Sequence, residues 1–123
     1  MVEVGPRPTS IIIKRRLLLG FIVNGVLSLD DIRLSGKRVL YRVDINSPLH
    51  PETGAFLDDG RLRAITPTLS ALSDAKVVIL GHQSRPGRSD FTDLSGHADR
   101  ISRILGRPIK FIPDVCGEIA IDA

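Results

Sequence analysis

Two loops of the sequence carry side chains whose chemistry suits a small anionic ligand. The first contains Asp44 and Asn46, and the second contains His82 and Arg85. An imidazole and a guanidinium both donate hydrogen bonds, and the forked guanidinium matches the oxygens of a phosphate or carboxylate. A carboxylate and an amide can orient a hydroxyl group. Together the four side chains predict binding of a small phosphorylated hydroxy acid, whereas the second loop by itself is equally compatible with two solvated side chains.

The segments around these loops have the spacing of alternating strands and helices. The expected strands are residues 37–43, 77–80 and 109–112, and the expected helices are residues 61–73 and 94–105. Pro67 should kink the first helix or begin a new one, and Gly106 should end the second. The unbroken apolar run Val77–Leu80 is typical of a strand buried on both faces. With right-handed crossovers, this order predicts a parallel β-α-β-α-β sheet of the doubly wound α/β class.

Such a sheet would bring both loops to one edge. Parallel strands end at the same edge, and ligands of open α/β sheets bind there. Asp44 and Asn46 should therefore lie beside His82 and Arg85, and Arg61, at the start of the first helix, should point to the same edge. Three strands and two helices leave an edge exposed and a face uncovered, so we expect an incomplete sheet that is part of a larger domain.

The composition is that of a globular domain and argues against nucleic-acid binding. The 123 residues are 42% apolar and 25% charged, with a net charge of +3. Residues 1–24 hold four basic residues and one acidic residue, and residues 25–123 hold 13 of each, so the basic excess lies in the first 24 residues. Four Phe and one Tyr offer little base-stacking surface. A single cysteine, Cys116, favours a reducing cytosol, and no Cys/His cluster has metal-ligand spacing.

Residues 1–24 differ in composition from the rest and combine basic residues with apolar runs. They lack a signal-peptide cleavage site, and their apolar stretch is too short to span a bilayer. An interfacial arm, a strand added at a sheet edge and non-native upstream sequence all remain open, and the last is favoured. We predict a poorly ordered extension over residues 1–24, with little contact to a domain over residues 25–123. Deleting residues 2–24 should then leave the melting temperature nearly unchanged.

Several other polar residues have simpler explanations than ligand binding. His50 and His97 have no evident partners and are expected at the surface. Cys116 is expected to be a small packing residue. Asp58 and Asp59 are expected to cap the first helix and not to bind magnesium.

At these residues the sequence resembles phosphoglycerate kinases, specifically the N-terminal domain of the archaeal branch. The matching segments, in the family's order and spacing, are Arg42–Pro48, Asp58–Ala64, Pro67-Thr68, Gly81–Gly87 and Pro113–Gly117. The resemblance covers about residues 27–118. It implies an incomplete Rossmann-like sheet in three layers. It also implies a cytoplasmic glycolytic transferase that moves a phosphoryl group between ATP and 3-phosphoglycerate, or between ADP and 1,3-bisphosphoglycerate, with magnesium.

The resemblance also implies roles for individual residues. Asp44 and Asn46 would bind the hydroxy-carboxylate end of 3-phosphoglycerate, and His82 and Arg85 would belong to the basic patch for its phosphate. Arg61 would be the catalytic arginine that stabilises the transferring phosphoryl group. One departure is Ser84, which stands where the family motif usually has glycine.

The family's nucleotide domain, with its glycine-rich motif, has no counterpart in this sequence. We therefore expect the chain to hold 3-phosphoglycerate, to bind neither ATP nor Mg2+, to offer no metal site and to be inactive alone. The alternative is a truncated, non-catalytic relative that binds a phosphorylated metabolite or a protein partner. Self-association through the exposed sheet edge is also open, whereas nucleic acids and membranes are not expected partners.

Overall fold

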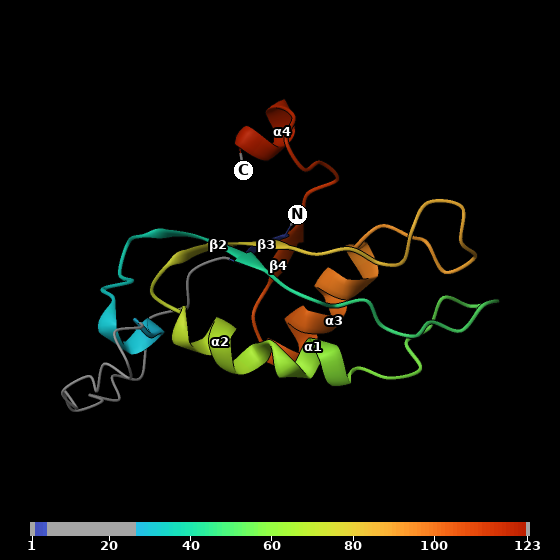
Figure 1. Cartoon of the computed structure of the whole chain (residues 1–123), viewed down its shortest axis with the longest axis horizontal. Coiled ribbons are helices and arrows are strands. Elements are labelled where there is room, and N and C mark those ends of the chain that lie inside the picture. The colour runs from blue at the N-terminus through green and yellow to red at the C-terminus, as the bar shows by residue number, and fades with distance from the viewer. Residues whose placement is uncertain (1, 5–26, 123) are drawn as a thin grey trace.

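Alternating apolar positions build one sheet with helices packed against it. The structure is a computed structural model that describes residues 2–4 and 27–122. The elements are β1 (Val2–Val4), a 3-10 helix (Leu29–Asp31), β2 (Arg38–Arg42), α1 (Gly60–Ala64), α2 (Thr66–Ala71), β3 (Lys76–Leu80), α3 (Ser95–Leu105), β4 (Ile109–Phe111) and α4 (Glu118–Ile121), shown in Figure 1. The expected strands and helices are therefore present at nearly the expected positions.

The helix boundaries follow from single residues. Pro67 lies in the first turn of α2, where its missing N–H group has no partner to lose, so the expected helix is divided into α1 and α2. Gly106 ends α3 in the left-handed conformation, with φ of 67°. The sequence analysis anticipated both features.

The strands form a single sheet in the order β2-β3-β1-β4. β2 and β3 are parallel neighbours, with Arg38 opposite Lys76 and Arg42 opposite Leu80. β1 is antiparallel to both β3 and β4, so that β3 and β4 run in the same direction. The common direction of β2, β3 and β4, with helices in the crossovers, confirms the predicted Rossmann-like α/β fold.

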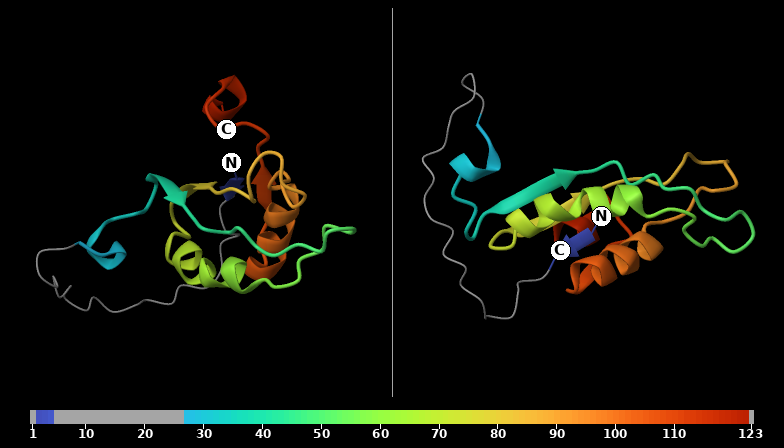
Figure 2. Two further views of the ribbon diagram at one scale, coloured as in Figure 1. Left: turned by 45° about the vertical axis from the view of Figure 1, so that its right-hand side comes forward. Right: turned by 90° about the horizontal axis from the view of Figure 1, so that it is seen from below.

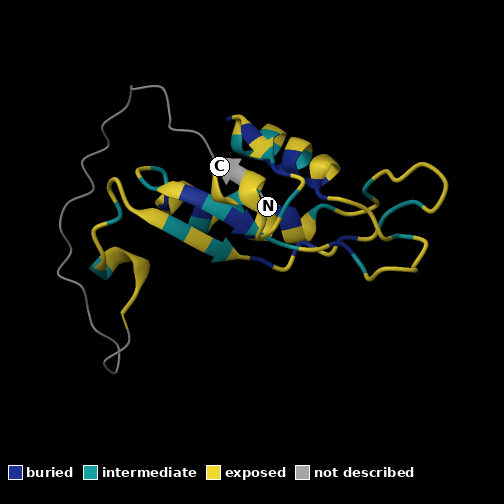
Figure 3. Ribbon diagram, turned by 90° about the horizontal axis from the view of Figure 1, so that it is seen from above, coloured by how far each residue is buried: buried dark blue, intermediate teal, exposed yellow. Residues whose placement is uncertain are grey.

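The core lies between the sheet and the three helices α1, α2 and α3, which cover the same face (Figures 1 and 2). Val77 and Ile79 of β3 are fully buried on this side. Val78 and Leu80 point to the other face and are only partly buried, an alternation that is visible along the strands in Figure 3. The prediction that β3 is buried on both faces is therefore wrong for the described residues. It fails because both crossovers place their helices on one face.

The first residues of the chain are part of this sheet. β1 pairs with β3, from Val2 opposite Ile79 to Val4 opposite Val77, and with β4, where Val2 lies opposite Phe111. The prediction that residues 1–24 have little contact with the core is therefore wrong at Val2–Val4, and deletion of residues 2–24 is instead expected to lower the melting temperature. Residues 5–24 lie outside the described residues, so the domain boundary near residue 24 stays a prediction.

We expect the substitution Glu3→Pro to lower the melting temperature by about 5 °C or more. Glu3 lies opposite Val78 and Lys110 in the middle of β1, where proline cannot donate a ladder hydrogen bond. A loss of about 1 kcal/mol lowers the melting temperature of a domain this size by several degrees. Thermal denaturation followed by circular dichroism measures the effect, with Glu3→Ala as the control. Equal melting curves for the two variants would show that β1 contributes nothing to stability.

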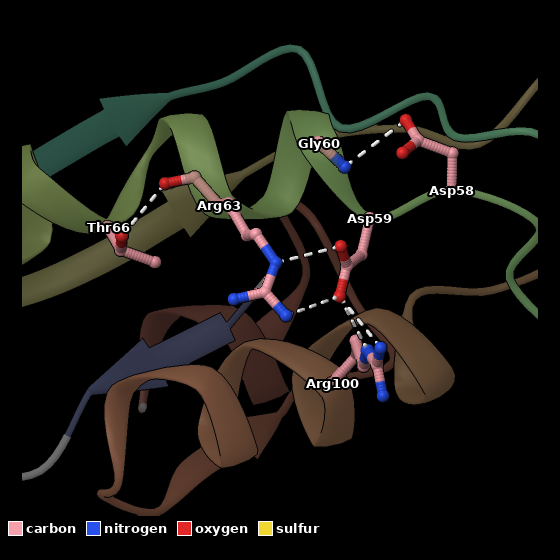
Figure 4. Close-up of polar contacts among 6 residues, drawn as sticks. All are labelled: Asp58, Asp59, Gly60, Arg63, Thr66 and Arg100. Atoms are coloured by element: carbon pink, nitrogen blue, oxygen red, sulfur yellow. Dashed lines mark hydrogen bonds and ion pairs between the residues drawn. The ribbon is translucent and has the colours of Figure 1, made fainter.

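Asp59 joins the first helix to α3 (Figure 4). Its carboxylate accepts hydrogen bonds from Nε and Nη2 of Arg63 at 2.9 and 3.1 Å, and from Nη2 of Arg100 on α3 at 2.7 Å. Asp58, not Asp59, makes the cap-like contact, because its Oδ2 accepts from the N–H of Gly60 at 3.2 Å. The capping prediction thus holds for Asp58, and Asp59 is an ion-pair residue.

The ion pair of Asp59 should make the stability of the fold depend on pH. The hydrogen bonds from Arg63 and then Arg100 lower the pKa of Asp59. A carboxylate whose pKa is lower in the folded than in the unfolded protein stabilises the fold when it is ionised. This stabilisation is complete above the unfolded pKa of about 3.9 and is lost as the pH falls below that value. Asp59→Asn should therefore melt earlier than the wild type at pH 7, and the difference should shrink below about pH 4. A difference independent of pH between 7 and 3 would exclude this role.

Candidate functional site

The pairing of β2 with β3 brings the two polar loops together. The ladder continues one residue beyond the strands, where the N–H of Val43 donates to the carbonyl of Leu80 at 2.9 Å. The next residues are Asp44 on one loop and Gly81 on the other. A Cβ atom at Gly81 would lie 2.7 Å from Cδ1 of Ile45, which is too close for any real contact. The absence of a side chain at Gly81 therefore allows the loops to approach each other.

A hydrogen bond between the loops holds their tips. Oδ1 of Asn46 accepts from the backbone N–H of Ser84 at 3.0 Å. The oxygen of Asn46 is thus used within the protein, and its NH2 group is the end that can donate to a ligand.

The loops surround a hollow of about 470 Å³, which we call the anion hollow. It is lined by Asn46, His82, Ser84, Arg85, Arg88 and Asp90. Three of the five predicted site residues, Asn46, His82 and Arg85, are therefore brought together. Arg88 was not predicted as a site residue, although it follows Arg85 across the Pro-Gly turn as a second basic residue. Two guanidinium groups against one carboxylate give the hollow a positive charge.

Asp44 and Arg61 lie at the same edge of the sheet but do not line the anion hollow. They form an exposed ion pair with each other. This pair, followed by the backbone N–H of Asn46, lowers the pKa of Asp44, and His82 acts in the same direction. The pair keeps the guanidinium of Arg61 next to Asp44, at the carboxyl end of β2. The catalytic and binding roles of these residues stay predictions.

Ser84 has the backbone conformation that glycine favours. Its φ is +55°, the one positive φ of a non-glycine residue among residues 2–4 and 27–122. Its hydroxyl donates to Oδ1 of Asp90 at 2.6 Å. This bond fixes the loop and offsets the steric cost of the left-handed conformation.

We expect Ser84→Ala to destabilise the fold by about 1 kcal/mol, because alanine keeps the strained conformation and loses the hydrogen bond. Ser84→Gly should change stability by less, because glycine relieves the strain while losing the same bond. Urea denaturation of the two variants measures the difference. If Ser84→Ala is at least as stable as Ser84→Gly, the backbone at Ser84 is not strained.

Besides Arg88, two buried residues behind the loops were not predicted as part of the site, namely His97 and Gln83. The prediction that His97 is a surface residue is wrong, since His97 is 1% exposed and contacts Phe56 edge to face. Its spacing from Leu94 and Ile101 places it on the buried face of α3, and that periodicity was the available signal. His50 is only partly buried, and its Nδ1 accepts from the N–H of Glu52 at 3.3 Å. Cys116 is exposed, so the packing prediction for it is also wrong.

In the described part of the chain, no group of three His, Cys, Asp or Glu residues could hold a metal ion. No described helix is long and apolar enough to cross a membrane.

Comparisons with known protein sequences identify a family to which this chain is similar. The sequence model of the family "Phosphoglycerate kinase" matches residues 29–123. The phosphoglycerate kinase of Methanocorpusculum labreanum is 50% identical over 93 residues, which are 76% of this chain and 23% of that protein. The enzyme of Methanothermobacter thermautotrophicus is 50% identical over 95 residues, again 76% of this chain and 23% of that protein. The chain thus spans about a quarter of the length of these curated relatives.

The fold leads to the same family. The crystal structure of phosphoglycerate kinase from Pyrococcus horikoshii superposes with a TM-score of 0.74 and 36% identity, covering 79% of this chain and 24% of that chain. Phosphoglycerate kinase from Coxiella burnetii gives a TM-score of 0.57 and 31% identity, covering 66% of this chain and 22% of that chain. The sequence match over most of the chain and the superposition of the fold show that this chain belongs to the phosphoglycerate kinase family.

Proposed function

We propose that this chain is the 3-phosphoglycerate-binding part of a phosphoglycerate kinase. The observation that carries the proposal is the anion hollow, in which Asn46 from one loop and His82 and Arg85 from the other line one cavity. The guanidinium of Arg85 and the imidazole of His82 suit the phosphate end of the ligand. Asp44 and the NH2 group of Asn46 suit its hydroxyl and carboxylate.

In the proposed reaction the residues of this chain position and neutralise charge. Phosphoryl transfer requires little covalent chemistry from the protein, so positioning and charge stabilisation dominate. Arg61 lies next to Asp44 at the carboxyl end of β2, where its guanidinium can meet the charge of the transferring group once its pair with Asp44 opens. The described residues do not fit a magnesium site, because no suitable acidic cluster is present. We therefore assign magnesium to none of the described residues.

Calorimetric titration of the 123-residue chain with 3-phosphoglycerate tests the proposal. Glycerate and inorganic phosphate are the controls, because each carries one end of the ligand. We expect 3-phosphoglycerate to bind most tightly, with an affinity that falls as salt is added. Asp44→Ala should weaken binding of 3-phosphoglycerate and glycerate, and should change binding of inorganic phosphate less. Equal affinity of the wild type and Asp44→Ala for all three compounds would exclude Asp44 from the site, and failure of the wild type to bind 3-phosphoglycerate would exclude the proposed function.

Three further expectations belong to this proposal. The chain alone should not phosphorylate 3-phosphoglycerate with ATP, and a coupled assay of the purified chain tests this. It should be found in the cytoplasm. β2 is an edge strand of the described sheet, and its Leu40 is 65% exposed, which favours self-association at that edge. Sedimentation velocity at increasing concentration measures that association, and Leu40→Lys should reduce it.

A further inference from the structure

The side chain of Gln83 joins the two loops from inside the protein. Its Nε2 donates to the carbonyl of Ser47 at 2.9 Å, and its Oε1 accepts from the N–H of Ser47 at 3.0 Å. Both residues are almost completely buried. The amide of Gln83 therefore satisfies both backbone groups of Ser47, beyond the point where the β2–β3 ladder ends. Without it, two buried backbone groups would lose their partners, which is costly.

His97 attaches this amide to α3. The two contacts with Ser47 determine which end of the Gln83 amide is the oxygen. Nε2 of His97 lies 3.0 Å from that oxygen, so the ring must donate, and the hydrogen is on Nε2. Burial lowers the pKa of His97, against smaller opposing effects of the Ile45 carbonyl and Asp93. The ring is therefore neutral near pH 7, in the tautomer that the contact requires.

These contacts reach the anion hollow through neighbouring residues. Ser47 follows Asn46, and Gln83 lies between His82 and Ser84. Ser84 in turn donates its N–H to Asn46. Asn46, Ser47, Gln83 and Ser84 thus form two crossed links between the loops, which we call the loop clasp. His97 anchors the clasp to α3 through its contact with Gln83.

We propose that Gln83 and His97 are positioning residues that hold Asn46 at a fixed place relative to His82 and Arg85. The inference rests on the proposed function, because it assumes that these three residues bind the ligand. Neither Gln83 nor His97 lines the anion hollow, so each acts through the loop clasp.

The first test removes the amide. Gln83→Leu keeps the buried volume but leaves both backbone groups of Ser47 unpaired. We expect its affinity for 3-phosphoglycerate, measured by calorimetry, to fall about tenfold or more. The amide resonance of Ser84 should also shift in a 1H–15N spectrum, because its bond to Asn46 is part of the clasp.

The second test separates positioning from stability. His97→Phe keeps the ring and its contact with Phe56 but cannot donate to Gln83. We expect its affinity to fall about threefold without a matching loss of melting temperature, and His97→Gln, which restores a donor, to recover most of the loss. Ile101→Val is the matched control, because Ile101 is buried on the same helix and its apolar side chain cannot form a hydrogen bond to the clasp. It should lower the melting temperature and leave the affinity unchanged. In a Gln83→Leu background, His97→Phe should have no further effect on affinity.

The outcomes distinguish this inference from the proposed function. If the wild type does not bind 3-phosphoglycerate, the proposed function fails, and the Ser84 resonance still reports whether the clasp depends on Gln83 and His97. If the wild type binds and both His97→Phe and Gln83→Leu bind equally well, the positioning role is wrong. If affinity follows melting temperature through every variant, including Ile101→Val, the two residues are only structural. Should Gln83→Leu fail to fold, the comparison of His97→Phe, His97→Gln and Ile101→Val decides alone.

Discussion

Gly81→Ala is expected to destabilise the fold by about 1–3 kcal/mol, the usual cost of an extra methyl group in a packed core. The new methyl carbon would lie 2.7 Å from Cδ1 and 2.8 Å from Cγ1 of Ile45, a fully buried side chain. Ile45 stands between Asp44 and Asn46, so its displacement should also separate the two loops. We expect the affinity for 3-phosphoglycerate to fall together with stability. Urea denaturation and calorimetry measure the two effects.

Ile45→Val provides the matched control, because it removes the atom closest to the new methyl group. By itself it should cost about 0.5–1.5 kcal/mol. Combined with Gly81→Ala, it should cost less than the sum of the two single changes, because the smaller side chain relieves part of the contact. Additive effects of the two substitutions would show that the contact with Ile45 is not the cause.

Arg85→Ala is expected to weaken binding of 3-phosphoglycerate about tenfold to hundredfold. A charge-assisted hydrogen bond contributes about 1.5–3 kcal/mol, which corresponds to that range of affinities. The side chain is exposed and lines the anion hollow, so its removal should not disturb the core. Arg85→Lys should recover only part of the affinity, because an ammonium cannot donate two parallel hydrogen bonds to one phosphate.

Arg88→Ala measures whether the second guanidinium of the hollow also contacts the ligand. A loss confined to Arg85→Ala would assign the phosphate to one arginine, and similar losses would assign it to both. Wild-type affinity in Arg85→Ala, with unchanged dependence on salt, would exclude the anion hollow as the phosphate site.

Local patterns predicted the elements that a single stretch of chain determines. Pro67 and Gly106 act on the backbone within one turn, and both ended or began helices where expected. The alternation of strands and helices predicted that β2 and β3 are parallel. Because parallel strands end at the same edge of a sheet, it also predicted that Asn46 and Arg85 lie close together, as they do in the anion hollow.

The features that could not be predicted from the sequence depend on contacts with segments that are distant along the chain. The apolar run of β3 is compatible with helices on one face of the sheet or on both faces. In the described part of the chain, α1, α2 and α3 all cover the same face. The spacing of His97 on α3 indicates its burial, but its partner could not be predicted, because Gln83 is 14 positions away and on another element. The contact of Val2–Val4 with two strands was missed because its partners begin more than 70 residues further along the chain.

The place of β1 in the sheet has a consequence for the order of folding. β2 and β3 can pair as soon as residues 38–80 are available, since only a helical crossover separates them. β4, by contrast, has β1 as its neighbour in the sheet, and Val2 lies opposite Phe111. The β1–β4 contact joins residues more than 100 positions apart, so closing it directly is entropically costly, whereas prior pairing of β1 with β3 leaves only the α3 crossover to be closed. β1 therefore pairs with β3 first and provides the neighbour beside which β4 is added.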